Sequence, residues 1–172
     1  MPARDRKSDR RSTAPSPPTI HPATALVIGA GNRFRRDDGV GPMVARRLRA
    51  LLPSGVVVLE TGGEAAELLE AWQGFERVII VDAASSGGTP GALRRIDVAE
   101  ESLCHLSPSA SSHGLGVTEA VELARALGRL PSHLVVYAVE GEDFTTGEGL
   151  SRQVAAAVPH LLQQILAEVT TL

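Results

Sequence analysis

Apolar side chains follow two different patterns along this chain. Short, nearly continuous apolar runs occupy 25–28, 56–59, 77–81 and 134–139, which is typical of strands that are buried on both faces. Between these runs, apolar residues recur at every third or fourth position, as they do on one face of a helix. Strands that alternate with helices in this way predict an α/β fold with a mostly parallel sheet.

The helical spacing predicts four helices. They cover 40–52, a short stretch through 68–72, 117–127 and 150–169. A fifth and weaker strand is expected at 92–96, after the turn at Thr89-Pro90-Gly91. The sequence shows no internal repeat, so we expect one domain over residues 23–172.

The first 22 residues differ in composition from the rest. They are rich in Arg, Ser and Pro and contain almost no large apolar side chains. Such a segment cannot bury enough apolar surface to fold by itself, which predicts a disordered tail at residues 1–22.

Composition excludes several classes of protein. The net charge of −3 gives no indication of a nucleic-acid or membrane partner, and no apolar run is long enough to span a bilayer. The single cysteine, Cys104, cannot form an internal disulfide. Lysine occurs only at Lys7, which excludes a phosphate-loop lysine from the folded body. We expect a cytoplasmic monomer.

Candidate chemistry lies near the ends of the predicted strands. Asp37 and Asp38 follow the first strand, Asp82 ends the third, and His113 precedes the helix at 117–127. The carboxyl ends of strands in an open α/β sheet are where ligands bind. One histidine with two carboxylates suits a divalent ion such as nickel, zinc or cobalt, and leaves coordination positions open.

Each of these residues also has a purely structural interpretation. Asp37 and Asp38 could cap the helix that begins near Val40, Asp82 could cap the segment after Ala83, and His113 could bond to loop backbone.

A dinucleotide site at Gly29-Ala30-Gly31, with Glu60 on the ribose, is the main rival. It fails because Phe34 replaces the third glycine, and because Asp37 and Asp38 would repel a phosphate at the helix start.

Several segments in order resemble the hydrogenase maturation proteases. They are 27–32 with 37–42, the glycine turn at 60–63, the strand at 79–83, the histidine loop at 111–115, Pro90-Gly91, and the late segment 142–150. The resemblance covers nearly everything after the tail. It implies a twisted, mostly parallel five-stranded sheet flanked by helices, in a three-layer sandwich of the phosphorylase/hydrolase-like kind.

The resemblance also implies an activity, which is a single cut near the C-terminus of a nickel-loaded [NiFe] hydrogenase large-subunit precursor. Asp38, Asp82 and His113 are then the metal contacts, with Asp38 also the catalytic candidate in an aspartyl-type or metal-assisted cleavage. Nickel is expected to arrive with the precursor as a recognition mark, with zinc or cadmium as substitutes in vitro.

Substrate contacts are expected at Gly62 and Gly63, in the glycine turn, and at Arg33 and Arg36, which flank the site.

Two functions of other classes remain open at this point. One is a non-catalytic chaperone that binds nickel and the precursor, and the other is a nucleotide-binding α/β module.

Overall fold

The computed structural model describes residues 25–103 and 115–171. Its centre is one five-stranded sheet with the strand order β2-β1-β3-β5-β4. The strands are β1 (Ala25–Ala30), β2 (Val56–Thr61), β3 (Arg77–Ala84), β4 (Leu93–Asp97) and β5 (His133–Glu140). Neighbouring strands are parallel, except that β4 runs antiparallel to β5 at the sheet edge. The predicted mostly parallel sheet is therefore confirmed.

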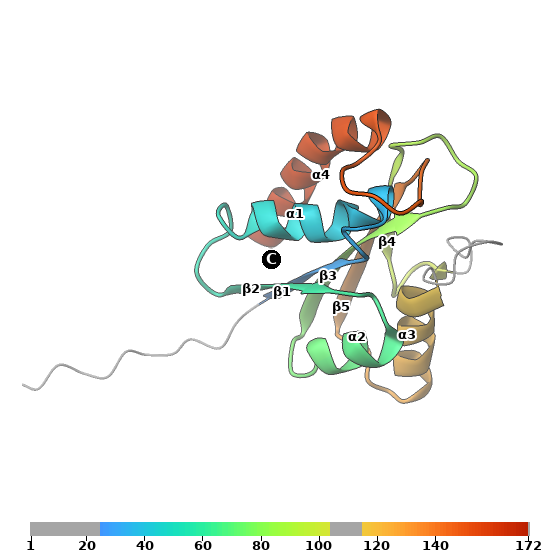
Figure 1. Ribbon diagram of the computed structural model, residues 1–172. Helices are drawn as coiled ribbons and strands as arrows, with labels where there is room; N and C mark the ends of the chain where they lie inside the picture. The colour runs from blue at the N-terminus through green and yellow to red at the C-terminus, as the bar shows by residue number, and fades with distance from the viewer. Residues whose placement is uncertain (1–24, 104–114, 172) are drawn as a thin grey trace, which may run out of the picture.

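Helices cover both faces of this sheet. They are the 3-10 helix η1 (Arg36–Gly39), α1 (Val40–Leu48), α2 (Ala65–Ala71), α3 (Leu115–Ala126) and α4 (Arg152–Thr171). In Figure 1, α1 and α4 lie on one face, and α2 and α3 lie on the other. The three-layer arrangement expected from the resemblance is confirmed. No helix within the described ranges is long and apolar enough to cross a membrane.

The alternation of side chains along β1 divides the core in two. Leu26 and Ile28 are fully buried in the cluster that includes Trp72 and Val121, from the α2 and α3 face. Val27, between them in sequence, is fully buried in the opposite cluster with α1 and α4. Successive strand residues point to opposite faces, so a strand that is covered on both must be apolar throughout. This is the physical basis of the continuous apolar runs.

The third strand is longer than its apolar run. The sequence predicts an end at Val81, whereas β3 continues to Ala84, and Ala83 and Ala84 pair with the last two residues of β5. Asp82 therefore lies within the strand and does not follow it. The apolar run ended early because a carboxylate interrupts it, but the backbone pairing with β5 continues past that residue.

The strand order creates a topological switch point at the carboxyl ends of β1 and β3, which is called the β1–β3 crevice below. The chain leaves β1 toward β2 through α1, and then passes β1 again to form β3 on its other side. The connecting helices α1 and α2 consequently lie on opposite faces (Figure 1). In open α/β sheets, ligands bind outside the carboxyl ends of the strands where the connections diverge in this way. Here that point is between β1 and β3, where Asp38 and Asp82 lie.

Two glycines bring α1 directly against the sheet at this point. A Cβ atom on Gly29 would overlap the carbonyl of Gly41, and one on Gly41 would overlap the carbonyl oxygens of Ala30 and Val81. The first turn of α1 therefore packs backbone to backbone on β1 and β3. This contact sets the height of Asp38, three residues before Gly41, above the sheet.

Candidate active site

Asp37 joins two distant loops. Its side chain is fully buried, and its carboxylate accepts three backbone hydrogen bonds, from Glu142 and Asp143 to Oδ2 (2.9 and 3.0 Å) and from Ser151 to Oδ1 (2.6 Å). The N-terminus of α1 has no side-chain cap. The helix-cap interpretation is therefore wrong for Asp37, because its acceptors are used by the late segment instead.

Asp38 follows Asp37 on the 3-10 helix η1. It is 8% exposed, and its Oδ2 accepts a hydrogen bond from the backbone N–H of Asn32 at 3.0 Å. Gly31 has a φ of +122°, and a Cβ there would overlap the Asp38 carbonyl. The loop after β1 thus folds back on Asp38, and only glycine fits at its closest approach.

Asp82 has an unusual protonation equilibrium. Burial and, to a smaller extent, the negative charge of Asp38 together raise its pKa from 3.8 to about 7, although the 2.9 Å hydrogen bond from the Ala83 N–H acts in the opposite direction. Two carboxylates from η1 and β3 thus lie close enough to repel each other. A divalent cation between them would relieve this repulsion, so the pair fits the predicted metal chemistry.

The third predicted ligand lies outside the described residues. His113 belongs to the segment 104–114, as do Cys104, Ser111 and Ser112. The helix α3 begins two residues after His113, and a cavity of about 10 Å³ is lined by Asp82 together with Val117 and Thr118 of its first turn. Within the described ranges, no group of three His, Cys, Asp or Glu side chains could hold a metal ion. The three-residue metal site stays a prediction.

The glycine turn after β2 lies next to the end of β1, because a Cβ on Gly63 would lie 3.6 Å from the Ala30 Cβ and 3.7 Å from the Gly31 nitrogen. Gly63 is buried, its N–H donates to Thr61 Oγ1 at 3.1 Å, and a Cβ on Gly116 of α3 would overlap its carbonyl. Gly62 is exposed and its N–H donates to Glu67 Oε2 at 3.1 Å. Gly63 therefore packs the turn against α3, whereas Gly62 faces an open hollow where a substrate could contact it.

Glu60 is not available to a ribose. Its two carboxylate oxygens form ion pairs with Arg46 of α1 and with Arg49, which caps the end of that helix, each at 2.9 Å. This pairing removes the acid on which the dinucleotide interpretation relied.

The arginines near the site differ in their surroundings. The Arg35 guanidinium donates to the carbonyl of Phe144 at 3.3–3.4 Å, which helps to join the two loops. Arg36 is exposed, has a φ of +50°, and lies 3.9 Å from an Asp143 carboxylate oxygen. Arg33 lies over the Phe34 ring at 4.5 Å. Arg33 and Arg36 both remain exposed and can reach a substrate.

Comparisons with known proteins agree over most of the chain. The family model for hydrogenase maturation protease (HycI) matches residues 42–168, a range that includes Asp82 and begins after Asp38. Hydrogenase 2 maturation protease from Escherichia coli (strain K12) is 30% identical over 145 residues, which are 83% of this chain and 88% of the relative.

Solved structures of hydrogenase maturation proteases also match this chain. The hydrogenase maturating endopeptidase HybD from E. coli matches with a TM-score of 0.75 and 27% identity, covering 86% of this chain and 93% of that one. The [NiFe] hydrogenase maturation protease HybD from Thermococcus kodakarensis matches with a TM-score of 0.65 and 27% identity, covering 83% and 96%.

These matches confirm the predicted family, fold and enzyme class. They favour an endopeptidase over the nucleotide-binding module and the non-catalytic chaperone. The chain belongs to the hydrogenase maturation protease family, a family of endopeptidases.

Proposed function

We propose that this endopeptidase removes the C-terminal extension of a [NiFe] hydrogenase large-subunit precursor only after nickel has been loaded. Asp38, Asp82 and His113 contact nickel that the precursor carries, and the ion is thus part of the substrate. The names of the relatives support the substrate class, since they include hydrogenase 2 maturation protease and [NiFe] hydrogenase maturation protease.

The observation that carries this proposal is the pair of carboxylates at the β1–β3 crevice. Asp82 has a pKa of about 7 because it is largely removed from water and lies beside the negative charge of Asp38. Two neighbouring carboxyl groups that repel each other, or share a proton, do not stabilise the fold. The arrangement becomes favourable when a cation binds between them and displaces the proton. A precursor without nickel leaves that repulsion in place, which gives the protease a way to distinguish the two forms.

Asp38 is the proposed catalytic carboxylate. It is held by Asn32 and by the glycine contact at Gly31, on a short helix that Asp37 fixes to the late segment. This rigid support suits a group that must activate water beside the scissile bond. Gly62, at the exposed edge of the β2 turn, and the exposed Arg33 and Arg36 are the proposed contacts with the precursor chain.

The test uses precursor prepared with and without nickel. Purified protease is incubated with each form, and the mass of the large subunit is followed over time. We expect cleavage of the loaded form only, and none by Asp38→Asn or Asp82→Asn protein. Asp97→Asn is the matched control, because the Asp97 carboxylate also accepts a local backbone hydrogen bond, from Ala99 at 3.0 Å, but lies on β4. Cleavage of both precursor forms at similar rates would refute nickel recognition.

A further inference from the structure

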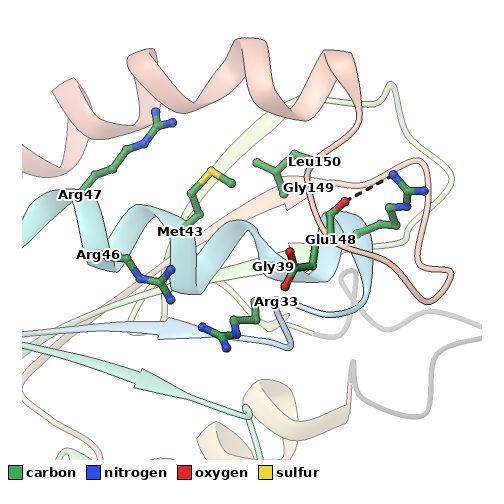
Figure 2. Close-up of a pocket in the computed structure, with 9 residues that line it drawn as sticks. Arg33, Gly39, Met43, Arg46, Arg47, Glu148, Gly149 and Leu150 are labelled. Atoms are coloured by element: carbon green, nitrogen blue, oxygen red, sulfur yellow. Dashed lines mark hydrogen bonds between the residues drawn. The ribbon is translucent and has the colours of Figure 1, made fainter.

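A second hollow lies on the outer side of α1, away from the crevice. It has a volume of about 320 Å³ and is bounded by α1, the end of the loop after β1, and residues 148–150. Figure 2 shows Met43 and Leu150 between the two elements, with arginine side chains around them. Both apolar side chains are partly exposed. The hollow is therefore an apolar floor with a cationic rim.

Four arginines line this hollow, and two of them have no acidic partner in the described part of the chain. Arg46 is paired with Glu60, and Arg36 lies 3.9 Å from Asp143. Arg33 has only its stacking contact with Phe34, and Arg47 forms no ion pair within residues 25–103 and 115–171.

One carboxylate, that of Glu148, also lines the hollow. Its single charge does not balance the two unpaired guanidinium groups. An excess of positive charge therefore remains around the apolar floor.

Guanidinium groups of this kind recognise carboxylates through paired N–H donors. An inorganic anion would use the rim but leave Met43 and Leu150 exposed to water. A peptide segment with acidic side chains beside an apolar one would use both, because the apolar side chain removes the floor from water. The combination of rim and floor thus favours an acidic peptide.

The hollow adjoins the proposed active site through Arg33. The same residue also lines a neighbouring hollow of about 400 Å³, together with Asn32 and Gly62, beside the Asp38 loop. That neighbouring hollow contains Glu64 and Glu67 and carries the opposite charge. A peptide that crosses Arg33 therefore meets an acidic surface on the site side and a basic surface on the α1 side.

We propose that the hollow between α1 and residues 148–150 docks an acidic segment of the hydrogenase precursor. Carboxylates of that segment pair with Arg33 and Arg47, and an adjacent apolar side chain packs on Met43 and Leu150. This docking rests on the proposed function for the identity of the partner. The docking proposal adds an anchoring surface outside the metal site. It also gives the direction in which the precursor segment crosses the protease, from the hollow beside α1 past Arg33 to the active site.

The first experiment measures docking without cleavage. A fluorescein-labelled synthetic peptide with Glu-Leu-Glu repeats and its Gln-Leu-Gln counterpart are titrated against wild-type protein by fluorescence anisotropy. We expect the Glu peptide to bind at least about tenfold more tightly, with backbone amide shifts centred on Met43, Arg47 and Leu150 in NMR spectra. Equal binding of the two peptides, or shifts centred elsewhere, would overturn the proposal.

The second experiment measures docking during processing. Arg47→Glu reverses one charge on an exposed side chain of α1, and Arg129→Glu makes the same change beyond α3, on the opposite face. We expect Arg47→Glu to raise the KM for nickel-loaded precursor about tenfold with little change in kcat, and Arg129→Glu to leave both constants unchanged. An unchanged KM for Arg47→Glu overturns the docking surface.

The two proposals fail in different ways. Wild-type protein that binds the Glu peptide but leaves loaded precursor uncut refutes the proposed function and keeps the anionic docking surface. Wild-type protein that cuts loaded precursor but does not distinguish the two peptides refutes the docking surface alone.

Discussion

The replacement Asp82→Asn should make the metal-free protein more stable at alkaline pH. Burial and the neighbouring Asp38 charge raise the Asp82 pKa from 3.8 to about 7, so ionising this carboxyl opposes folding. Asparagine keeps the shape and an oxygen that can accept the Ala83 N–H, but it carries no charge. The replacement therefore removes the free-energy cost of a buried negative charge and retains the hydrogen bond.

The size of this stabilisation depends on pH. A carboxyl whose pKa is raised in the folded state stabilises the fold fully below its unfolded pKa of 3.8, and this contribution is lost as pH rises to about 7. The difference between the folded and unfolded pKa values corresponds to a loss of stability of at most about 4 kcal/mol. Because Asp82 is partly exposed, we expect about 2–4 kcal/mol at pH 8, and less than half of that at pH 5.

Urea denaturation at pH 5 and pH 8 measures this difference, with Asp97→Asn as the control that should gain nothing. Calorimetric titration of Ni²⁺ into the same proteins should show that the stabilised variant binds the ion more weakly. For wild type, affinity should fall below about pH 7, where protons compete with the ion for Asp82. An Asp82→Asn protein that is less stable than wild type at pH 8 would show that the carboxylate is not under strain.

Replacements at three other positions test the framework around the crevice by chemical denaturation or hydrogen exchange. Asp37→Ala should cost about 3–5 kcal/mol, because it leaves three backbone N–H groups without their charged acceptor, and Asp37→Asn should cost less but remain measurable. Gly41→Ala should cost at least about 1–3 kcal/mol, since its methyl group meets two carbonyl oxygens of the sheet; the unchanged stability of this variant would mean that α1 can shift freely. Glu140→Gln should weaken the loop at 86–88, whose Ser86 hydroxyl and Gly87 and Gly88 N–H groups donate to that carboxylate, and hydrogen exchange should speed up there but not at Gly62.

The fold could be predicted from the sequence because its signal is local. A strand covered on both faces has to be apolar at each position, so runs such as 25–28 and 134–139 mark the central strands directly. The end of β3 could not be predicted in the same way. Asp82 faces the crevice, and the strand continues through backbone pairing with β5, which no side-chain pattern reports.

The site could be predicted only in part. The sequence placed Asp38 and Asp82 at the carboxyl ends of the strands, where they are found, but the only structural role it offered for Asp37 was a helix cap. The actual partners of Asp37 lie between 105 and 114 positions later in the chain. Backbone N–H groups carry no residue-specific signal, so a contact of this kind is invisible in one sequence. The same holds for Gly41, whose small size matters only because β1 and β3 lie beneath it.

The long separation between Asp37 and its partners has a consequence for the order of assembly during synthesis. A nascent chain can close β1, α1, β2 and β3 from local and medium-range contacts. The short helix that carries Asp38 is fixed only when residues 142–151 have emerged and reached it. Since ribosomes add about 5–20 residues per second, these two events are seconds apart. The chain therefore completes its sheet before it fixes Asp38, the proposed catalytic carboxylate. On that proposal, the growing chain holds no competent active centre until residues 142–151 have been made.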